Sequence, residues 1–170
     1  MKIIFLDIDG VCNCSDTKER FHGLIGVEPE KIKLVKQIVD ATGAKLILSS
    51  TWRIGWFYEE TGTHLNDFQE WQYLKEEFAK QGLFFFDYTP LHKNRHRGIE
   101  IQMWLDKWED EIDAYCIIDD DMFDIRDMHK GHIVKTSFEY GLQQGAVDMA
   151  IKILNKEKNN GQKFSSNRFD

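Results

Sequence analysis

The chain has 170 residues, enough for one domain with a sizeable core, and its 42% hydrophobic and 30% charged residues are typical of a soluble globular protein. The formal net charge of -7 argues against a protein that coats nucleic acid over a broad face, but it leaves room for a local basic patch. No stretch is apolar for long enough to span a membrane, and acids interrupt the N-terminal run before an export signal of usual length. We therefore expect a cytoplasmic protein without membrane partners.

The three cysteines, Cys12, Cys14 and Cys116, are an odd number in a chain without an export signal. A disulfide framework is therefore not expected. Cys12 and Cys14 have no second Cys or His pair at the spacing of a metal site, so we interpret them as packing or incidental thiols.

Apolar runs and helical periodicity alternate along the chain. Strands buried on both faces of a parallel sheet are predicted over residues 2–9, 45–50, 115–119 and 132–136. Apolar residues at helical spacing predict helices over residues 28–43, 66–82, 97–110 and 143–154. This alternation implies right-handed crossovers and an α/β fold, a Rossmann-like three-layer sandwich with a central parallel sheet. We expect one domain over residues 1–155 and a polar C-terminal tail over 156–170.

Three of the predicted strands end in polar residues, in the pairs Asp7/Asp9, Ser49/Ser50 and Asp119/Asp120. In an open α/β sheet the carboxyl ends of parallel strands meet at one edge, where sites form. Acids crowded together at that edge would repel one another. Mg²⁺ would relieve the repulsion, since it prefers carboxylates together with the phosphate oxygens of a substrate.

The spacing of Asp7 and Asp9 favours a shared task. If the chain leaves strand geometry at Ile8, both acids point into the site instead of to opposite faces of the sheet. Gly10 then permits a turn that a side chain would obstruct. One carboxylate can attack a phosphorus atom, while the other protonates the leaving oxygen and then activates water.

These segments, taken in order, resemble the motifs of the haloacid dehalogenase (HAD) superfamily of phosphohydrolases. They are DIDG at residues 7–10, a serine after the next core strand, a basic residue before a helix, and IIDDDMFD at residues 117–124. More narrowly, DIDGVCN, LSSTWR, RGIEIQMWL and IIDDD resemble the HAD-type phosphatase domain of multi-module Swiss Army Knife RNA repair proteins. They also resemble deoxyribonucleotidase-like members. The resemblance covers about residues 1–145.

The resemblance implies four catalytic residues. Asp7 corresponds to the nucleophile and Asp9 to the general acid and base. Ser49 would hydrogen-bond the phosphoryl oxygens, and Arg97 would neutralise the developing negative charge. Lys93 and Arg95 remain alternatives for this basic residue, because HKNRHRG offers all three.

The resemblance also implies a Mg²⁺ site and contacts to the substrate. The metal would be held by Asp7, Asp9, Asp120 and Asp119, with Asp9 acting through its backbone carbonyl and Asp119 as a supporting acid. Asp124 would lie just outside this group. Substrate contacts are expected from Ser50, Thr51, Arg53 and Lys93.

Two sets of side chains have open roles. Arg53 either reaches a substrate phosphate or base, or pairs with an acid inside the fold. Trp52, Trp56 and Tyr58, near the second motif, are candidates for stacking on a nucleobase. The other aromatic residues between Trp52 and Tyr88 are expected mainly in the core, since Phe68, Trp71 and Phe78 have helical spacing.

The intervals between the motifs leave no room for a large cap domain, so we expect a minimal cap and an open site. By family analogy, open sites suit bulky substrates such as nucleic-acid ends. We therefore expect a Mg²⁺-dependent phosphomonoesterase that acts on nucleotides or on terminal phosphates of nucleic acid. A small-metabolite phosphatase and a catalytically degenerate HAD-fold binding protein remain alternatives. A receiver-like signalling domain is disfavoured, because its acidic pair comes first in the chain. The oligomeric state stays open.

Overall fold

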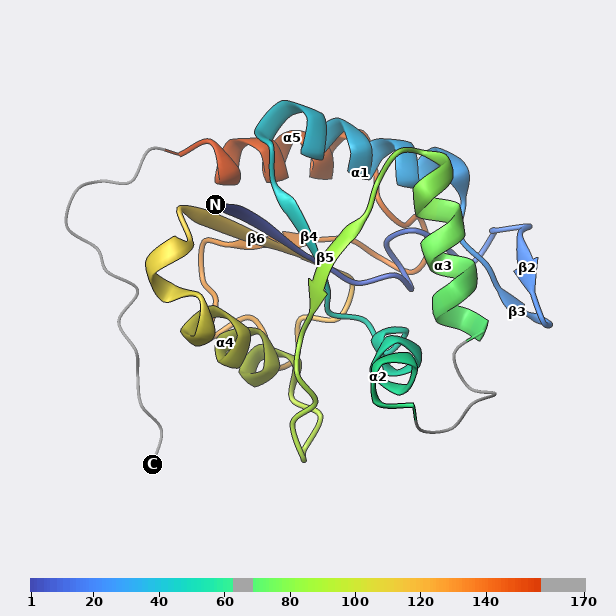
Figure 1. The fold of residues 1–170 in the computed structure, drawn as a ribbon. Helices are drawn as coiled ribbons and strands as arrows, with labels where there is room; N and C mark the ends of the chain where they lie inside the picture. Colours follow the sequence, from blue (N-terminus) through green and yellow to red (C-terminus); the bar gives the residue numbers. More distant parts are fainter. Residues whose placement is uncertain (63–68, 157–170) are drawn as a thin grey trace.

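The computed structural model describes residues 1–62 and 69–156 of the chain. Its centre is a five-stranded, wholly parallel sheet in the order β5-β4-β1-β6-β7 (Figure 1). The strands are β1 (Lys2–Leu6), β4 (Lys45–Leu48), β5 (Phe85–Tyr88), β6 (Ala114–Asp119) and β7 (Ile133–Lys135). A separate small hairpin pairs β2 (Arg20–Phe21) with β3 (Leu24–Ile25).

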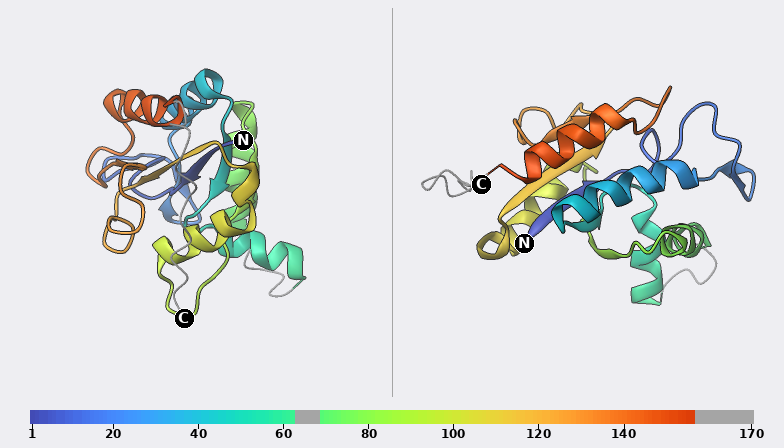
Figure 2. Two further views of the ribbon diagram at one scale, coloured as in Figure 1. Left: turned by 90° about the vertical axis from the view of Figure 1, so that its left-hand side faces the viewer. Right: turned by 90° about the horizontal axis from the view of Figure 1, so that it is seen from above.

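Helices cover both faces of this sheet, as the views in Figures 1 and 2 show. One face packs against α1 (Pro29–Thr42), α3 (Gln69–Lys80) and α5 (Gln144–Leu154), and the other against α4 (Arg97–Lys107). A short 3₁₀ helix, Glu109–Glu111, follows α4, and α2 (Arg53–Thr61) begins soon after β4 ends. In the described part of the chain, no helix combines the length and apolar character needed to cross a membrane.

The two layers of the core come from the alternation of side chains along β1. Ile4 and Leu6 pack with the cluster under α1, α3 and α5, whereas Ile3 and Phe5 pack with the cluster under α4. All four side chains are completely buried. Phe5 also meets the ring of Trp104 on α4 edge-on, with ring centroids 5.4 Å apart. This arrangement confirms the predicted three-layer α/β sandwich.

Register explains why the polar ends of the central strands meet. Leu6 of β1 pairs with Leu48 of β4 and with Ile118 of β6. The ladder continues one step, because the Asp7 N–H donates to the Ile118 carbonyl (3.0 Å) and the Ser49 N–H donates to the Leu6 carbonyl (3.1 Å). Asp7, Ser49 and Asp119 therefore lie at the same level of the carboxyl edge.

The fold adds one helix and three strands to the elements predicted. The four predicted strands and the described parts of the four predicted helices are present, and no large cap occurs among residues 1–62 and 69–156. The unpredicted elements are β5, α2 and the β2–β3 hairpin. β5 is a four-residue edge strand without polar alternation, and each hairpin strand has only two residues, so periodicity gives them little signal. Phe68 and tail residues 157–170 lie outside the described residues.

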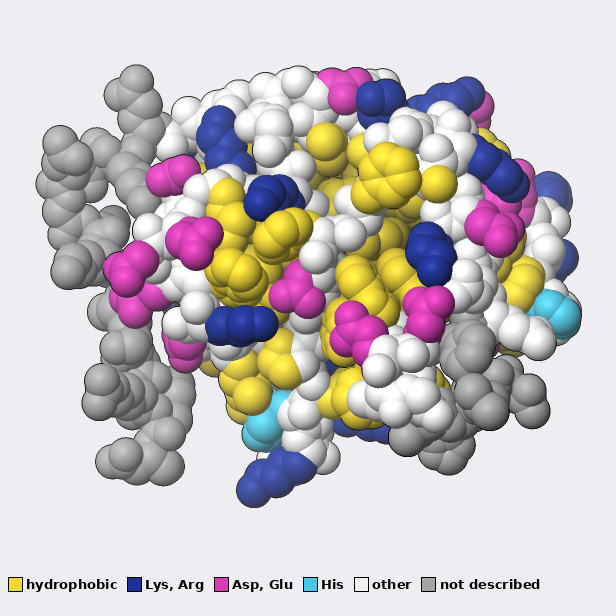
Figure 3. All heavy atoms as spheres, in the orientation of Figure 1, with side chains coloured by type: hydrophobic (Ala, Val, Ile, Leu, Met, Phe, Trp, Pro, Cys, Tyr) yellow, Lys and Arg dark blue, Asp and Glu magenta, His cyan; other side chains and the backbone are white. Residues whose placement is uncertain are grey.

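The exposed face beside β5 carries hydrophobic side chains among acidic and basic ones (Figure 3). Phe84 and Phe86 are 72% and 42% exposed. The Nζ atom of Lys45 lies 3.9 Å from the centroid of the Phe86 ring, an arrangement that lets the cation interact with the ring face. β5 is therefore an edge strand whose surface mixes apolar and charged groups.

The three cysteines are free and buried, as expected for thiols that contribute to packing. Burial raises the pKa of the Cys12 and Cys116 thiols well above their ordinary value. Both thiols therefore stay protonated at neutral pH, and a protonated buried thiol is a poor nucleophile.

Candidate active site

Three aspartates form a compact cluster at the carboxyl edge of the sheet. Asp7, Asp119 and Asp120 each offer a carboxylate oxygen, and these oxygens lie within 4.8 Å of one another. Asp7 directly follows β1, Asp119 is the last residue of β6, and Asp120 follows it. Asp7 and Asp119 are buried, and Asp120 is partly buried. Such a set of oxygen ligands matches what Mg²⁺ prefers.

Arg97, the first residue of α4, bridges two members of this cluster. Its Nη1 atom lies 3.0 Å from Oδ2 of Asp7 and 2.5 Å from Oδ2 of Asp119. Burial opposes the charge on the guanidinium, but these two carboxylates raise the pKa of Arg97 above its ordinary value. Lys93 and Arg95 are exposed on the preceding loop, so among the three candidate basic residues it is Arg97 that contacts the acids.

The loop after β6 positions Arg97 from the other side. The backbone N–H of Arg97 donates to Oδ2 of Asp124 (2.6 Å). The next residue is Gly98, where a Cβ atom would lie 2.2 Å from the carbonyl oxygen of Asp124. Only glycine lets the loop approach the start of α4 this closely. Gly98 follows the basic residue directly in the sequence, but its contact with Asp124 cannot be predicted from spacing alone.

The cluster holds more negative than positive charge. Burial raises the pKa of Asp119 above its ordinary value, and the neighbouring Asp7 carboxylate raises it further, while Arg97 and the Asp121 N–H act in the opposite direction. Burial and Asp7 likewise raise the pKa of Asp120. Three carboxylates thus share one guanidinium, and a cation bound among them would stabilise their ionised forms.

Gly10 makes the cluster sterically possible. Its φ angle is +70°, a left-handed conformation that a side chain disfavours. A Cβ atom at this position would lie only 2.3 Å from Oδ2 of Asp120. The turn after Asp9 and the position of Asp120 therefore both require glycine here.

Asp9 lies outside the three-aspartate cluster and is held by its own partners. Asn13 Nδ2 donates to Oδ1 of Asp9 (2.8 Å), and Trp52 Nε1 donates to Oδ2 (3.0 Å). Asn13 is completely buried and also accepts a hydrogen bond from the Gly10 N–H (3.0 Å). Sequence reasoning missed Asn13, although its position four residues after Asp9 in a tight turn is a local signal for such a bond.

The hydroxyl groups after β4 differ in their surroundings. Ser49 Oγ is buried and has no hydrogen-bond partner among the described residues. Ser50 Oγ accepts a weak bond from the Trp52 N–H (3.4 Å), and Thr51 is exposed. An unsatisfied buried hydroxyl costs about 1–3 kcal/mol, so a phosphoryl oxygen that bonds Ser49 Oγ would recover this energy.

Two further hydroxyls at the same edge went unpredicted. Thr89 directly follows β5 and Thr136 directly follows β7, and each is buried with an Oγ1 atom that lacks a partner among the described residues. Each continues its ladder, since the Thr89 N–H donates to the Leu48 carbonyl (3.1 Å) and the Thr136 N–H donates to the Asp119 carbonyl (3.0 Å). No sequence motif drew attention to these threonines.

Arg53 has its partners in the interior of the fold. The side chain is 4% exposed, and its Nη2 atom lies 2.5 Å from Oε2 of Glu100 on α4. The guanidinium also donates to the carbonyls of Ser49 (2.9 Å), Ser50 (2.6 Å) and Thr89 (3.1 Å). Arg53 thus ties the turn after β4 to β5 and α4. Its alternative role, an ion pair inside the fold, is the one that the structure contains.

The three aromatic candidates near this turn have three different surroundings. Trp52 is buried and holds Asp9, as described above. Trp56 stacks on Trp71 of α3, with ring centroids 4.3 Å apart and planes 5° from parallel. Tyr58 lines a cavity between α2 and the β2–β3 hairpin. Trp52 and Trp56 are therefore engaged by the protein itself.

An α/β domain whose central strands bring aspartates and serines to one edge, where a helix begins with an arginine, has the arrangement of a HAD-type domain. Residues 3–147 match the family described as the HAD domain in Swiss Army Knife RNA repair proteins. This match covers most of the chain, and the chain belongs to this family. No curated protein and no solved structure matched the chain.

Proposed function

We propose that the chain is a Mg²⁺-dependent phosphomonoesterase that forms an aspartyl phosphate on Asp7. The observation that carries this proposal is the bridging of Asp7 and Asp119 by Arg97, with Asp120 in the same cluster. A partly buried guanidinium next to a carboxylate nucleophile can neutralise a phosphoryl group as charge develops on it.

The reaction has two steps in which Asp7 and Asp9 act in turn. First, a carboxylate oxygen of Asp7 bonds to phosphorus and the bond from phosphorus to the substrate oxygen breaks, while Asp9 gives that oxygen a proton. Next, Asp9 takes a proton from water as the water oxygen bonds to phosphorus. The bond between phosphorus and Asp7 then breaks, which releases inorganic phosphate and restores both carboxyl groups.

The hydrogen bonds around Asp9 suit a residue that exchanges a proton with substrate and water. Asn13 and Trp52 bind one carboxylate oxygen each, so the plane of the group is held in place. Each oxygen retains a second lone pair that can carry a proton. Ser49 Oγ, which is unpartnered among the described residues, would bond the phosphoryl oxygens.

The donor set fits Mg²⁺, because all the candidate ligands are carboxylate or carbonyl oxygens. Asp7, Asp120 and the backbone carbonyl of Asp9 would hold the ion, with Asp119 as a supporting acid. When bound, Mg²⁺ supplies positive charge to the phosphoryl oxygens and orients them.

The proposed substrates are nucleotides and terminal phosphates of nucleic acid. Membership of a family named for RNA repair proteins supports this choice. The site also has no large cap among the described residues, and exposed Lys93 and Arg95 lie on the loop that leads into Arg97. This loop borders a cavity of about 300 Å³ that Arg95, Arg97 and Asp124 help to line. Basic side chains beside the site can contact further phosphates of a strand.

Phosphate release tests this proposal directly. The assay compares nucleoside monophosphates, oligonucleotides with 5′- or 3′-terminal phosphate and a sugar phosphate, each with Mg²⁺ and with a chelator. We expect Asp7→Asn to abolish release, while Asp127→Asn, the same change at a 93% exposed position, retains it. The preferred substrate separates a nucleotidase or end-healing enzyme from a small-metabolite phosphatase. Absence of release from every substrate would contradict the proposal and favour a binding protein.

A further inference from the structure

We propose that the slot between the β2–β3 hairpin and α2 binds the base of the nucleotide whose phosphate is removed. This inference rests on the proposed function and adds the part of the substrate that lies beyond the phosphate. The slot is a cavity of about 440 Å³. A volume of this size lies within the range of pockets that hold small organic ligands.

Two apolar walls face each other across the slot. The hairpin contributes Phe21 and Leu24, and α2 contributes Ile54 and Tyr58. Leu24 is 51% exposed, so its apolar surface is accessible to a ligand in the slot. A planar base between such walls would bury apolar surface on both of its faces.

The hairpin wall is attached to α3 by a ring stack and a hydrogen bond. Phe21 stacks on Tyr73 of α3, with ring centroids 4.5 Å apart and planes 12° from parallel. The Tyr73 hydroxyl accepts a hydrogen bond from the Val27 N–H (3.2 Å), which ties the chain after the hairpin to the same helix. The turn between the strands has positive φ angles at both His22 (+48°) and Gly23 (+82°). This combination is typical of the tight two-residue turn that best matches the twist of a hairpin.

The polar groups of the slot suit a base better than a phosphate. Its described lining residues include no Lys or Arg, so they supply no permanently charged cation to bind a phosphate. Gln69 and Glu70, at the start of α3, supply an amide and a carboxylate. A carboxylate accepts hydrogen bonds from the amino and imino groups at the edge of a base, and an amide can donate and accept.

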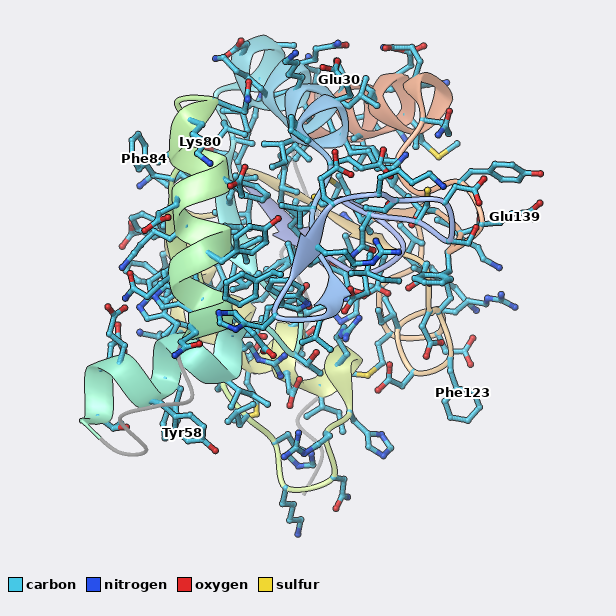
Figure 4. The ribbon with its side chains drawn as sticks, turned by 90° about the vertical axis from the view of Figure 1, so that its right-hand side faces the viewer. Glu30, Tyr58, Lys80, Phe84, Phe123 and Glu139 are labelled. Atoms are coloured by element: carbon cyan, nitrogen blue, oxygen red, sulfur yellow. The ribbon has the colours of Figure 1, made fainter. Side chains whose placement is uncertain are left out.

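The slot shares one residue with the turn after β4, which lies at the catalytic edge. Thr51 lines the slot and stands in the chain between Ser50 and Trp52, whose indole N–H holds Asp9. In Figure 4 the hairpin lies in front, and labelled Tyr58 extends from α2 below and to the left of the hairpin. A nucleotide can therefore place its phosphate at Asp7 and Asp9 and its base in the slot. The cavity near Arg97 contains mostly charged and polar side chains and suits neighbouring phosphates instead.

Binding to the Asp7→Asn protein tests the inference without turnover. Calorimetry with Mg²⁺ present compares a nucleoside monophosphate with ribose 5-phosphate, which lacks the base. We expect the nucleotide to bind roughly 5- to 150-fold more tightly, the range for one stacked base. Adding Leu24→Glu should remove this difference and leave the affinity for ribose 5-phosphate unchanged. Met149→Glu, at a 52% exposed methionine on α5, is the matched control and should change neither affinity.

Two further arms complete the experiment. Tyr58→Ala, on the opposite wall, should weaken the base effect in the same way, so the result does not depend on one variant. Oligonucleotides with a terminal phosphate on either an intact or an abasic nucleotide show whether a strand end uses the slot. Tighter binding of the ligand that carries a base, among free nucleotides or among strand ends, supports the inference and identifies which of the two uses the slot. Equal binding with and without the base for both kinds of ligand would overturn the inference. Failure of the phosphatase proposal would appear separately, as binding without phosphate release by the wild type.

Discussion

Two arginines of this molecule make similar short ion pairs but have different surroundings. Arg53 and Arg97 each lie 2.5 Å from an oxygen of a buried acid. Arg53 pairs with one glutamate and donates to three backbone carbonyls, and burial lowers its pKa despite Glu100. Arg97 contacts two aspartates that have a third beside them, and these carboxylates raise its pKa against the effect of burial.

The comparison separates scaffold from site by charge balance. One cation and one anion are matched around Arg53, and the remaining donors bind carbonyls of the turn after β4. One cation faces three carboxylates around Arg97, so the cluster retains negative charge that a bound cation would neutralise. Burial alone does not distinguish the surroundings of Arg53 from those of Arg97, because the acids in both places are almost wholly inaccessible to solvent.

The largest expected effect comes from breaking the balanced pair. Glu100→Ala leaves the Arg53 guanidinium buried without its anion, which should lower the free energy of unfolding by about 3–5 kcal/mol. Urea denaturation measures this loss. Glu109→Ala, at an exposed position just after α4, should change stability by less than about 0.5 kcal/mol. A loss below about 1 kcal/mol in Glu100→Ala would show that the pair is not a structural support.

Removal of Arg97 should affect the rate of phosphate release. Arg97→Ala is expected to lower kcat for phosphate release by about 10²- to 10³-fold, as loss of a charge-neutralising donor does. The variant should also gain more thermal stability from Mg²⁺ than the wild type, because Asp7 and Asp119 then lack the guanidinium that bridges them. Arg126→Ala, at an exposed position of the loop after β6, is the control. A kcat within a few-fold of wild type would contradict the role of Arg97.

Gly10→Ala should have a smaller effect that isolates the position of Asp120. Alanine at a positive φ angle costs more than about 1 kcal/mol, and here its Cβ would also meet Asp120. Gly43→Ala is a matched control, because Gly43 has a similar φ (+68°) with nothing within 4 Å of the added Cβ. We expect similar conformational costs in both variants, but weakened Mg²⁺ binding only in Gly10→Ala. Equal Mg²⁺ affinity in the Gly10→Ala and Gly43→Ala variants would show that Gly10 is not needed for metal binding.

The smallest expected effect is on the pH dependence of stability, through a histidine that contacts Gly98, the residue after Arg97. His129 is buried, with Nε2 2.9 Å from the Gly98 carbonyl and Nδ1 3.2 Å from the Tyr115 hydroxyl, and burial lowers its pKa below the ordinary value of 6.5. The folded protein therefore holds His129 neutral. Its contribution to stability is complete above pH 6.5 and is lost as the pH falls from there toward the lower pKa of the folded state. Urea midpoints between pH 7 and 5 should fall less steeply in His129→Gln, and identical slopes would contradict this.

The sequence was sufficient to predict four of the five strands of the central sheet and the meeting of their polar ends. Asp7, Ser49 and Asp119 each follow or end a buried run, so parallel pairing brings them together. The sequence was not sufficient to choose the role of Arg53. Its partner Glu100 lies 47 residues away on a helix whose orientation only the packed fold determines. The β2–β3 hairpin also escaped prediction, since two-residue strands leave no periodic pattern.

The central claim is that Asp7 receives the phosphoryl group. Asp9→Asn with an aryl phosphate tests it, because a good leaving group departs without a proton, whereas hydrolysis of the intermediate needs the base. Acid quenching and peptide mapping should find phosphate on Asp7, at a higher level than in the wild type. Phosphate release without any label on Asp7, or a label on another residue, would contradict the account.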